Sequence, residues 1–588
     1  MSSAHCATQQ PSGVTLASPW PPNARSYHDF VIPQGYVPPP YETSGAAPSV
    51  ICLGRGRQLF VDDFLVDTAA SNVERAWHTA TIHSMHALVP SLPWETGGGQ
   101  RRTARPFGAG SLIDPTGSKL LLWYRCGWRG SEGRTCVAFS RDGLRFIKPK
   151  LGLHGDRHLD GEHRRETNIV IETKHVEAFD VVRDFLSEPP RFVGLRMEFM
   201  TGGRRYGPYA SYVSADGLRW RKQRNVSQLI MADRSTFFLN PLRRPPMWVY
   251  SLRENLCSGG PSGHLRARRF WERPHGDAGQ GLTYRPFIQQ YFQCAGWRPG
   301  EPVPWFRPDG HDCHEGECDV YNVDGLAYES LILHGLAMLF RPNGGELKNN
   351  SIHLGFSRDG FHIARPPPPR EPFIRLPPRM RPRAGAGQDW LGLGNAQLAS
   401  GSPIVSASGD ELLFYFGYGA ASGHHGVQSA EGVYDHYDEG TGVARLRRDG
   451  FASMRPPAPR HGSPSDVATG LLTTRPLLFI GSRLFLNVVL GSSLARLRVD
   501  VLGPHKGSAG DFALLRNRSE AQLSGPLDAT LVEVPGRWSE FCGVPLRLRF
   551  HLHGPAELFA FWFTHSAQGH SSGFLGGGRF GVAGVVDE

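Results

Sequence analysis

The chain has 588 residues, of which 40% are hydrophobic, 71 are Gly and 47 are Pro. This length exceeds one ordinary core, so we expect a large domain and a second one, with many turns and few long helices. The formal net charge of +10 comes mainly from arginines that are scattered along the chain. Binding of nucleic acid needs a clustered basic face with stacking aromatics, so we predict no nucleic-acid partner.

Residues 1–56 are rich in Pro, Ser and Ala and lack the charged-then-apolar pattern of a signal peptide. We predict a largely disordered leader there. No run reaches the roughly 18 apolar residues that cross a membrane, so we predict no membrane span. The compartment is left open, with the cytoplasm as the default, and the oligomeric state is open too.

The nine cysteines are an odd number in a long chain and do not suggest a disulfide framework, although Cys126 and Cys136 could face each other across a hairpin. The run 311–318 (HDCHEGEC) contains ligand-type residues in a spacing that matches no zinc pattern. We interpret it as an exposed loop and predict neither a metal nor another cofactor.

A seven-residue phrase recurs at 140–146 (SRDGLRF), 214–220 (SADGLRW) and 357–363 (SRDGFHI), and in shorter form at 447–451 (RRDGF). Asp-Gly between two β-like runs is the strongest short signal of a hairpin. The first interval is 74 residues and the second is 143, close to twice as long, so a degenerate copy is expected between them, with 265–271 as the candidate. About five units result, which suits a β-propeller of four to eight blades.

Short β-like runs accompany each hairpin. The predicted strands are 109–113, 119–125, 135–140, 179–184, 191–198, 209–214, 236–239, 247–252, 327–340, 351–357, 402–406, 411–417 and 443–447. After a Pro-rich linker at 455–459 the hairpins stop, and alternating strands follow at 483–489, 494–501, 545–551 and 558–563. The predicted fold class is all-β, with a five-bladed β-propeller over 57–455 and a C-terminal β-sandwich over 456–588.

Several short phrases stand in order between residues 57 and 565, in addition to the hairpins. They are LFVDDFL at 59–65, PWE at 93–95, TTRPL at 473–477, LRLRF at 546–550 and LFAF at 558–561. Together they resemble a largely uncharacterised bacterial group related to glycoside hydrolase families 32 and 43. The resemblance implies a five-bladed propeller followed by a β-sandwich, and an oligo- or polysaccharide as the substrate.

Families 32 and 43 place three carboxylates around the propeller axis. One acid protonates the leaving oxygen, a second attacks the sugar or activates water, and a third positions the others. Among acids on or just before the first strand of each unit, we predict Asp184, Asp233 and Glu329 as catalytic residues. Other acids that this search left open are Asp62, Asp114, Asp180 and Glu317, whereas the repeated Asp142, Asp216 and Asp359 are predicted to form turns.

Sugar binding also requires polar donors and acceptors and aromatic platforms. The predicted substrate-binding residues are Asp63, Glu95, Arg253, Asp319 and Trp390. Three functions stay open: a glycosidase, a carbohydrate-binding or interaction propeller that has lost catalysis, and a glycoside phosphorylase in which phosphate replaces water. We expect the glycosidase-like function.

Overall fold

The computed structural model describes residues 6–22, 37–43, 47–97, 102–108, 110–128, 134–155, 166–172, 179–197, 209–225, 234–257, 264–277, 302–312, 316–342, 349–376, 393–420, 438–458, 468–504, 512–515 and 521–588. Within these ranges the chain is nearly all β. The helical elements are single turns such as α2 (Pro93–Thr96), and no described helix is long and apolar enough to cross a membrane.

Five antiparallel sheets of four or five strands follow one another along the described chain. Sheet 1 contains β5 (Thr103–Arg105), β6 (Ser111–Ile113), β7 (Leu120–Gly127), β8 (Arg134–Ser140) and β9 (Ile169–Glu172). Sheet 2 contains β10 (Phe179–Asp184), β11 (Arg191–Met197), β12 (Tyr209–Ser214) and β13 (Arg221–Asn225). Sheet 3 contains β14 (Thr236–Asn240), β15 (Met247–Cys257), β16 (His264–Pro274) and β17 (Val303–Phe306).

Sheet 4 contains β18 (Gly316–Glu329), β19 (Leu331–Pro342) and β20 (Asn349–Ser357), with β35 (Phe574–Leu575) added from the C-terminal end. Sheet 5 contains β21 (Leu393–Leu398), β22 (Ile404–Val405), β23 (Glu411–Ala420) and β24 (Gly440–Arg447), with β4 (Thr81–Leu88) as its last strand. Strand β6 contacts β10, β10 contacts β14, and β14 contacts β18. Strand β19 of the same sheet as β18 then contacts β21, and β22 contacts β6 again. The contacts between the five sheets therefore close on themselves.

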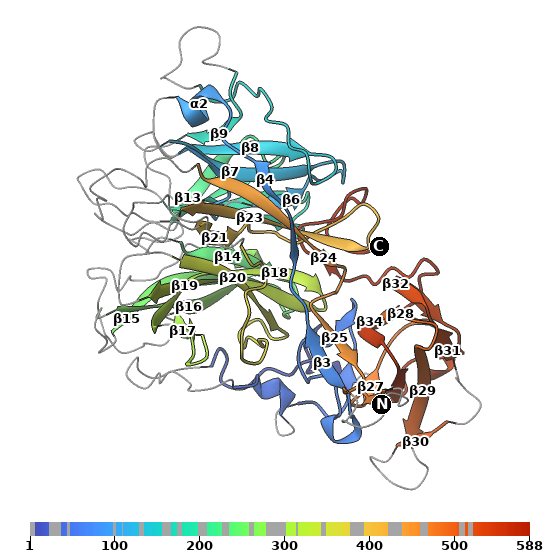
Figure 1. Ribbon diagram of the computed structural model, residues 1–588. Coiled ribbons are helices and arrows are strands. Elements are labelled where there is room, and N and C mark those ends of the chain that lie inside the picture. Colours follow the sequence, from blue (N-terminus) through green and yellow to red (C-terminus); the bar gives the residue numbers. More distant parts are fainter. Residues whose placement is uncertain are drawn as a thin grey trace, which may run out of the picture.

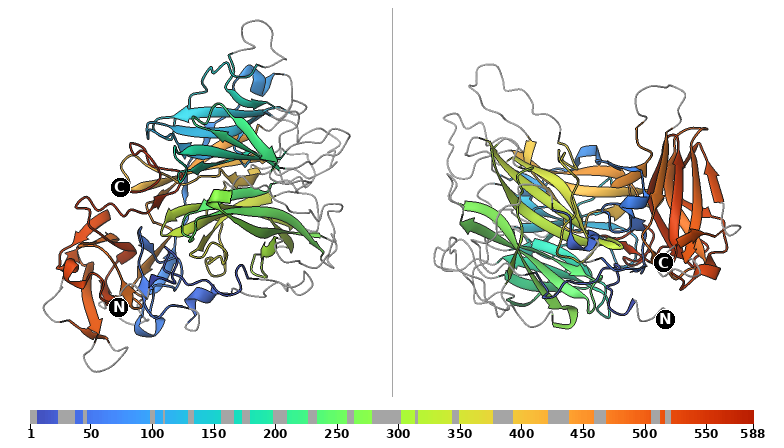
Figure 2. Two further views of the ribbon diagram at one scale, coloured as in Figure 1. Left: turned by 180° about the vertical axis from the view of Figure 1, so that it is seen from behind. Right: turned by 90° about the horizontal axis from the view of Figure 1, so that it is seen from below.

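Two further sheets lie at one side of these five (Figures 1 and 2). One contains β3 (Glu74–Trp77), β25 (Ala452–Arg455), β34 (Ala556–Thr564), β28 (Arg483–Leu490), β32 (Leu527–Val534) and β2 (Gln58–Leu59). The other contains β26 (Thr469–Thr473), β33 (Arg547–His553), β29 (Arg496–Pro504), β30 (Phe512–Leu514) and β31 (Ala521–Ser524). Their inner faces share one hydrophobic core, to which Leu486, Val499, Phe550 and Phe561 belong. In β33 buried residues alternate with partly exposed ones, which is the period of two that its sequence shows.

Both chain ends cross the boundaries predicted at residues 57 and 455. β2 and β3 precede sheet 1 in the chain but join the sheet of β34 and β25. At the other end, the N–H of Gly576 donates to the carbonyl of Ala327 at 3.2 Å, and the N–H of Ile113 donates to that of Gly577 at 2.8 Å. The C-terminal segment therefore bonds to sheets 1 and 4.

The described parts of the predicted leader are packed against later residues. Cys6 and Cys52 form a disulfide, and β1 (Ile51–Cys52) pairs with β27 (Leu477–Leu478). Val14 is completely buried in the core of the two C-terminal sheets. This part of the chain is therefore tied to the fold by a covalent bond, a strand pairing and an apolar contact.

The chain has more disulfides than its odd cysteine count suggested, and the pair named as facing each other, Cys126 and Cys136, is one of them. Cys126 and Cys136 are joined across the β7–β8 hairpin, where the Cα–Cα distance of 5.8 Å suits the bond, and Cys318 is disulfide-bonded as well. Among the described residues Cys542 has a free thiol. An odd total says nothing about which pairs the fold brings together.

The repeated Ser-x-Asp-Gly phrases follow the third strands β8, β12 and β20. In the first copy the N–H of Gly143 donates to the Ser140 hydroxyl at 2.8 Å, and Asp142 Oδ1 accepts from the N–H groups of Leu144 and Arg145 at 2.8 and 2.9 Å. The same bonds recur in the other two copies. These aspartates therefore form turns through their own side chains.

The candidate degenerate copy at 265–271 is not a turn, because these residues lie inside β16. β16 ends at Pro274 and is followed by the turn His275–Asp277, which occupies the place of the missing copy. The predicted strand 327–340 is also divided, since the chain turns between β18 and β19 at Glu329, whose φ is +49°.

Candidate functional site

A group of charged and polar side chains lies at the first strands of the sheets, and we call it the axial cluster: Asp180, Arg234, Arg268, Asp324 and Ser400. Asp180 is the second residue of β10, Arg234 precedes β14, Asp324 lies in β18 and Ser400 follows β21, so four sheets contribute. Asp180 and Arg234 are completely buried. Burial of this many charges is costly unless they are paired or used.

A small cavity of about 30 Å³ borders the cluster at Ser400 and Gly325. Its lining contains residues from strands of sheets 1 to 4, one from the turn between β21 and β22 of sheet 5, and two from the C-terminal segment. They are Leu112, Val181, Phe238, Leu326, Gly401, Phe574 and Val585. The five sheets therefore face one common centre, and the C-terminal segment lies across it.

Hydrogen bonds hold Asp324 and Arg268 in place. Asp324 Oδ2 accepts from Asn322 Nδ2 at 2.7 Å, and its Oδ1 accepts from the Ser400 hydroxyl at 3.3 Å. The Arg268 guanidinium donates to the carbonyl of Arg234 at 2.5 Å and to that of Tyr321. Arg268 therefore joins sheet 3 to the first strand of sheet 4.

Asp180 and Arg234 contrast with these two residues. No described residue meets hydrogen-bond geometry with either carboxylate oxygen of Asp180 or with the three guanidinium nitrogens of Arg234, although Ser400 and Arg234 are close enough to lower the pKa of Asp180. The Arg234 guanidinium lies 4.6 Å from the ring centroid of Phe107, and its backbone has a φ of +62°. Buried polar groups are almost always hydrogen-bonded, so these exceptions mark a place where something else can bind.

Gly108 closes the cluster from sheet 1. A Cβ atom at this position would lie 2.1 Å from Arg234 Nη1 and 2.6 Å from Asp180 Oδ1. Its φ of +75° is a conformation that favours glycine. The backbone of sheet 1 can therefore approach the Asp180 carboxylate and the Arg234 guanidinium only because residue 108 has no side chain.

The electrostatics of the two acids differ. Burial raises the pKa of Asp180 well above its usual value, while Arg234 lowers it and Asp324 raises it further. Burial also raises the pKa of Asp324, but Arg234 and the hydrogen bonds from Asn322 and Ser400 oppose that rise. Burial and the charge of the neighbouring Arg234 together lower the pKa of Arg268 to about 9. Asp180 is thus the better candidate for a protonated acid, and Asp324 for the ionised partner.

Two predicted substrate-binding residues lie in sheets 3 and 4, which also carry cluster residues. Asp319 lies five residues before Asp324 on β18, and its Oδ1 accepts from the N–H of Arg266 at 2.8 Å. The N–H of Arg253 donates to the hydroxyl of Ser235, the neighbour of Arg234, at 3.1 Å. The charge of Arg253 also lowers the pKa of Arg268.

Asp184 is buried at the end of β10, four residues or about 13 Å along the strand from Asp180. Its carboxylate accepts from the Ser187 hydroxyl at 2.5 Å and from Arg191 Nε at 3.2 Å, and it lies 2.6 Å from His275 Nε2. These contacts hold the ends of neighbouring strands. The predicted catalytic residue Asp233 and the predicted substrate-binding residue Trp390 lie outside the described residues.

Glu329 ends β18 in a second buried group, the Glu329 cluster, defined as Arg57, Glu329, Arg448, Asp449 and Asp587. Glu329 accepts from the N–H of Arg57 at 3.0 Å and from Arg448 Nη2 at 2.9 Å. The Arg57 guanidinium donates to Asp449 at 2.8 Å, and Arg448 donates to Asp587 at 3.2 Å. The cluster joins both chain ends to sheets 4 and 5.

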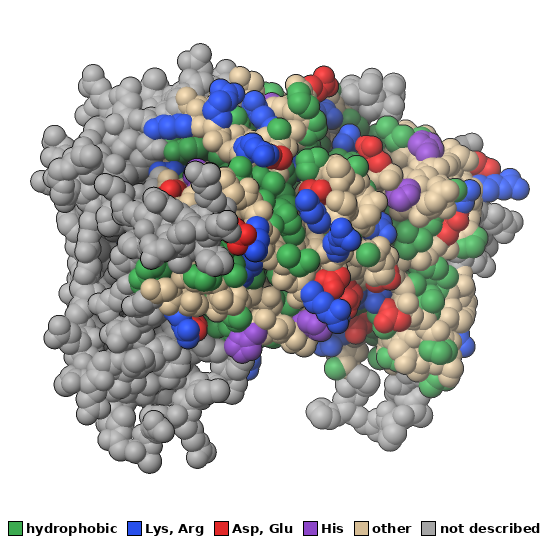
Figure 3. Space-filling model, turned by 90° about the horizontal axis from the view of Figure 1, so that it is seen from above, with side chains coloured by type: hydrophobic (Ala, Val, Ile, Leu, Met, Phe, Trp, Pro, Cys, Tyr) green, Lys and Arg blue, Asp and Glu red, His purple; other side chains and the backbone are tan. Residues whose placement is uncertain are grey.

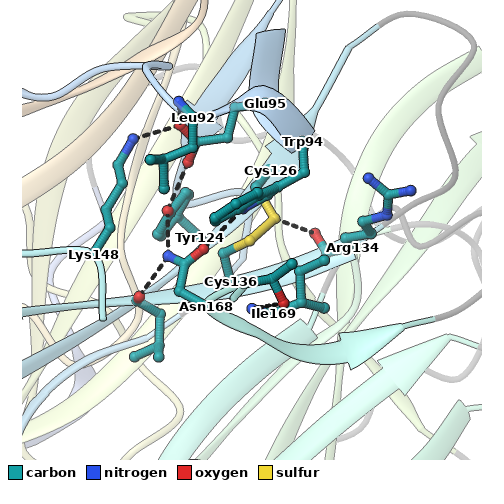
Figure 4. The surroundings of a disulfide bond; sticks show 12 residues. Leu92, Trp94, Glu95, Tyr124, Cys126, Arg134, Cys136, Lys148, Asn168 and Ile169 are labelled. Atoms are coloured by element: carbon teal, nitrogen blue, oxygen red, sulfur yellow. Dashed lines mark hydrogen bonds and ion pairs between the residues drawn. A yellow bond between two sulfur atoms is a disulfide. The ribbon is translucent and has the colours of Figure 1, made fainter. Parts of the chain in front are cut away.

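Glu95 lies in α2 beside the Cys126–Cys136 disulfide (Figure 4). It is completely buried and accepts from Lys148 Nζ at 2.5 Å and from the Tyr124 hydroxyl at 2.7 Å. Asp63 has a side chain that is 44% exposed and pairs with Arg75 at 2.5 Å. The structure therefore brings neither residue into the axial cluster.

Sequence reasoning considered Asp180 but preferred Asp184 on the same strand, and it did not single out Asp324, Arg234 or Arg268. An acid inside the largely apolar run 320–327 was the available signal for Asp324. Arg268 was hidden in the supposed degenerate repeat. Among the described residues, no group of three or more His, Cys, Asp and Glu side chains is placed to hold a metal ion.

On the face in Figure 3, described charged side chains of both signs are spread over the surface. Lys and Arg side chains lie there in separate small groups, several of them beside Asp and Glu. The concentration of charge in the axial cluster is therefore a feature of the interior.

No family model matches the chain, and no curated protein matches its sequence. Solved structures that resemble it include an N-acetylgalactosamine deacetylase from F. plautii in complex with blood group B trisaccharide, at 12% identity over 65% of this chain and 97% of that one, with a TM-score of 0.35. A member of the GH130 family of mannoside phosphorylases and glycoside hydrolases has 11% identity over 63% and 94%, with a TM-score of 0.36. An endo-arabinase from Bacteroides thetaiotaomicron has 11% identity over 58% and 94%, with a TM-score of 0.32. All three scores are below 0.5, and the proposals below rest on side chains instead.

Proposed function

We propose that the chain is a glycoside hydrolase-like enzyme that acts on a carbohydrate at the axial cluster. In this proposal the five sheets are the blades of a propeller, and the two C-terminal sheets form a β-sandwich. The small cavity lined by strands of sheets 1 to 4 and by the β21–β22 turn of sheet 5 supports the first part, and the core shared by the two C-terminal sheets supports the second.

The observation that carries the proposal is a pair of carboxyl groups in unlike environments. Asp180 is buried without a hydrogen-bond partner among the described residues, whereas Asp324 accepts two hydrogen bonds. Hydrolysis of a glycosidic bond needs one acid that holds a proton and one carboxylate that is ionised. Asp180 would protonate the leaving oxygen, and Asp324 would attack the sugar or activate water.

The arginines have separate roles in this reaction. Arg268 is held by two carbonyl groups and keeps the strands that carry the acids in register. Arg234 has no acceptor among the described residues and is free to bind an oxygen of the substrate. Arg253 and Asp319, which lie in sheets 3 and 4, would contact the sugar.

The same free guanidinium favours a second candidate, a glycoside phosphorylase. Arginine binds phosphate oxygens through two parallel hydrogen bonds, and Arg234 has all of its donors available among the described residues. Phosphate would then replace water as the group that attacks the sugar, and Asp180 would keep its role as the acid.

The test is an activity assay on a panel of glycans, with and without inorganic phosphate, that measures free reducing sugar and sugar 1-phosphate. Asp180→Asn and Asp324→Asn should each lower the rate by about 10²- to 10⁴-fold. Asp216→Asn, which changes a turn residue, is the matched control and should keep the activity. Sugar 1-phosphate as the main product would select the phosphorylase.

Unchanged activity in a folded Asp180→Asn variant would refute the site. Glycan binding without turnover by the wild-type protein would instead identify a carbohydrate-binding propeller. Thermal unfolding of each variant separates a loss of chemistry from a loss of fold.

A further inference from the structure

A second cavity, of about 180 Å³, shares no residue with the axial cluster. It lies between β20, the segment 365–373 and the end of β3, where Trp77 and His78 line it. No residue of the axial cluster, and no residue assigned a part in the proposed reaction, borders this space. Its chemistry can therefore be considered separately from the proposed function.

The segment after β20 runs back along the open edge of that strand. Phe356 and Ala364 exchange both backbone hydrogen bonds, at 2.9 and 2.7 Å, and the N–H of Phe373 donates to the carbonyl of Ile352 at 2.8 Å. Between these two points residues 365–371 turn away from the strand and form one wall of the cavity. The edge of β20 is thus paired at residues 352 and 356.

Leu354 lies between these two paired residues and lines the cavity. In an antiparallel strand every second residue directs its N–H and C=O to the same side, so Leu354 faces the same way as Phe356. Neither group of Leu354 has a hydrogen-bond partner on that side among the described residues. The cavity therefore offers a backbone donor and a backbone acceptor side by side.

Two arginines line the cavity beside this pair. Arg370 is only 6% exposed; its Nη1 donates to Asp309 at 2.6 Å and to Asp312 at 3.0 Å, and its Nε donates to the carbonyl of Pro366 at 3.0 Å. Its Nη2 is buried and has no partner among the described residues. Arg365 also pairs with Asp312, at 2.5 Å, so two arginines face two aspartates. The charges balance, and a neutral ligand fits better than an ion.

Most of the remaining lining is apolar, although His78, Thr79, His353 and Glu371 also border the cavity. Trp77 lies 5.9 Å from Phe356, and Phe451 lies 5.4 Å from Phe356 and 6.3 Å from Phe373, all between ring centroids. Three prolines complete the lining: Pro366, Pro367 and Pro369. Pockets for drug-sized ligands have volumes of about 300–1,000 Å³, so this cavity suits a single ring with one flat apolar face.

We propose that this cavity binds one neutral hexopyranose unit of a glycan. Two neighbouring hydroxyl groups of the sugar have a spacing similar to that of N and O within one residue, and each hydroxyl can both donate and accept. One would accept from the Leu354 N–H and the other would donate to its carbonyl. The C–H face of the ring would lie on Trp77.

The test is a titration of the full chain with the methyl pyranosides of glucose, galactose and mannose, followed by saturation-transfer NMR. We expect a Kd near the millimolar range for at least one of them, as for other single-ring ligands. Tetrahydropyran-2-methanol, which has the ring without neighbouring hydroxyls, should bind at least tenfold more weakly. Methyl glucuronide, which adds a negative charge, should gain nothing over methyl glucoside.

Trp77→Ala should weaken binding at least tenfold, Trp77→Phe less, and the control Trp220→Ala, a partly buried tryptophan in the β12–β13 hairpin, should leave it unchanged. Circular dichroism checks that each variant is folded. If Trp77→Ala does not fold, Trp77→Phe still tests the role of Trp77. Equal binding by the wild-type protein and both Trp77 variants would overturn the proposal. The proposal would also be overturned if tetrahydropyran-2-methanol bound as tightly as the methyl pyranosides, or if no methyl pyranoside bound.

Discussion

The axial cluster and the Glu329 cluster are both buried and both mix carboxylates with guanidinium groups, yet they differ in how completely their polar atoms are paired. Glu329 accepts from Arg57, Arg448 and Ser571 at 2.8 to 3.0 Å. Asp180 accepts no hydrogen bond from any described residue. A buried charge with all its partners present stabilises the fold, whereas one without them is retained at a cost to stability and marks a site for a ligand.

The locations of the two clusters agree with this difference. Asp449, Arg57 and Asp587 come from three distant parts of the chain, and their pairing holds the chain ends against sheets 4 and 5. The residues of the axial cluster lie at or near the first strands, where the sheets face a common centre. We therefore expect the axial cluster to bind the substrate and the Glu329 cluster to stabilise the fold.

The largest expected effect is on the stability of the Glu329 cluster. Glu329→Gln removes the negative charge that faces Arg57 and Arg448, and an uncompensated buried charge should lower the free energy of unfolding by about 3–5 kcal/mol. Chemical denaturation measures it. Glu533→Gln, the same change in an exposed pair with Arg483, should cost less than about 1 kcal/mol. Equal losses in both variants would abolish the distinction drawn between the clusters.

Two glycines allow a matched comparison of the clusters. A Cβ at Gly56 would lie 2.6 Å from the backbone of Glu329, which cannot move aside, and its φ is +90°. Gly56→Ala should therefore destabilise the chain by about 3 kcal/mol, from strain and overpacking together. At Gly108 the nearest atoms are the ends of the Arg234 and Asp180 side chains. Gly108→Ala should cost about 1 kcal/mol, mainly from its positive φ.

The enzymatic assay gives the opposite order for these two substitutions. Gly108→Ala should abolish most of the proposed activity because its methyl group occupies the space between Asp180 and Arg234. Gly56→Ala should leave the activity of the folded fraction unchanged. A stable, fully active Gly108→Ala variant would contradict the position of the site.

The two clusters should also differ in the sign of their contribution to the pH dependence of stability. Burial raises the pKa of Asp587, but Arg448 and Arg57 lower it by more. Its pKa is therefore about 2 in the folded state, against the ordinary value of 3.8. The unfolded chain therefore binds more protons between these values. Asp587 should contribute about 2 kcal/mol of stability above pH 4, which is lost as the pH falls from 3.8 through 2.

Asp180 should behave in the opposite way because its pKa is raised in the folded state. The folded chain then holds the extra proton, and stability falls as the pH rises above the usual aspartate value. Asp180→Asn should consequently gain stability relative to the wild-type protein on going from pH 4 to pH 8, whereas Asp587→Asn should lose stability relative to it on going from pH 2 to pH 4. Urea denaturation at a series of pH values measures both, and parallel pH profiles would refute the assignment.

The sequence by itself determined the local features. The three Ser-x-Asp-Gly hairpins form because Asp142, Asp216 and Asp359 hydrogen-bond to backbone groups two and three residues ahead, which needs no distant partner. The β-rich character followed from short alternating runs, and β33 shows the predicted alternation. The strand that carries Asp180 was also predicted, from 179 to 184.

Only the tertiary structure decided which charges meet. Asp449 has the same Asp-Gly context as the turn residues, yet it is buried and pairs with Arg57, which is nearly 400 residues earlier in the chain. Glu329 was expected at the start of a first strand, but β18 is 14 residues long and places it at the far end. Strand length, register and the return of both chain ends set these partners, and no spacing within the sequence encodes them.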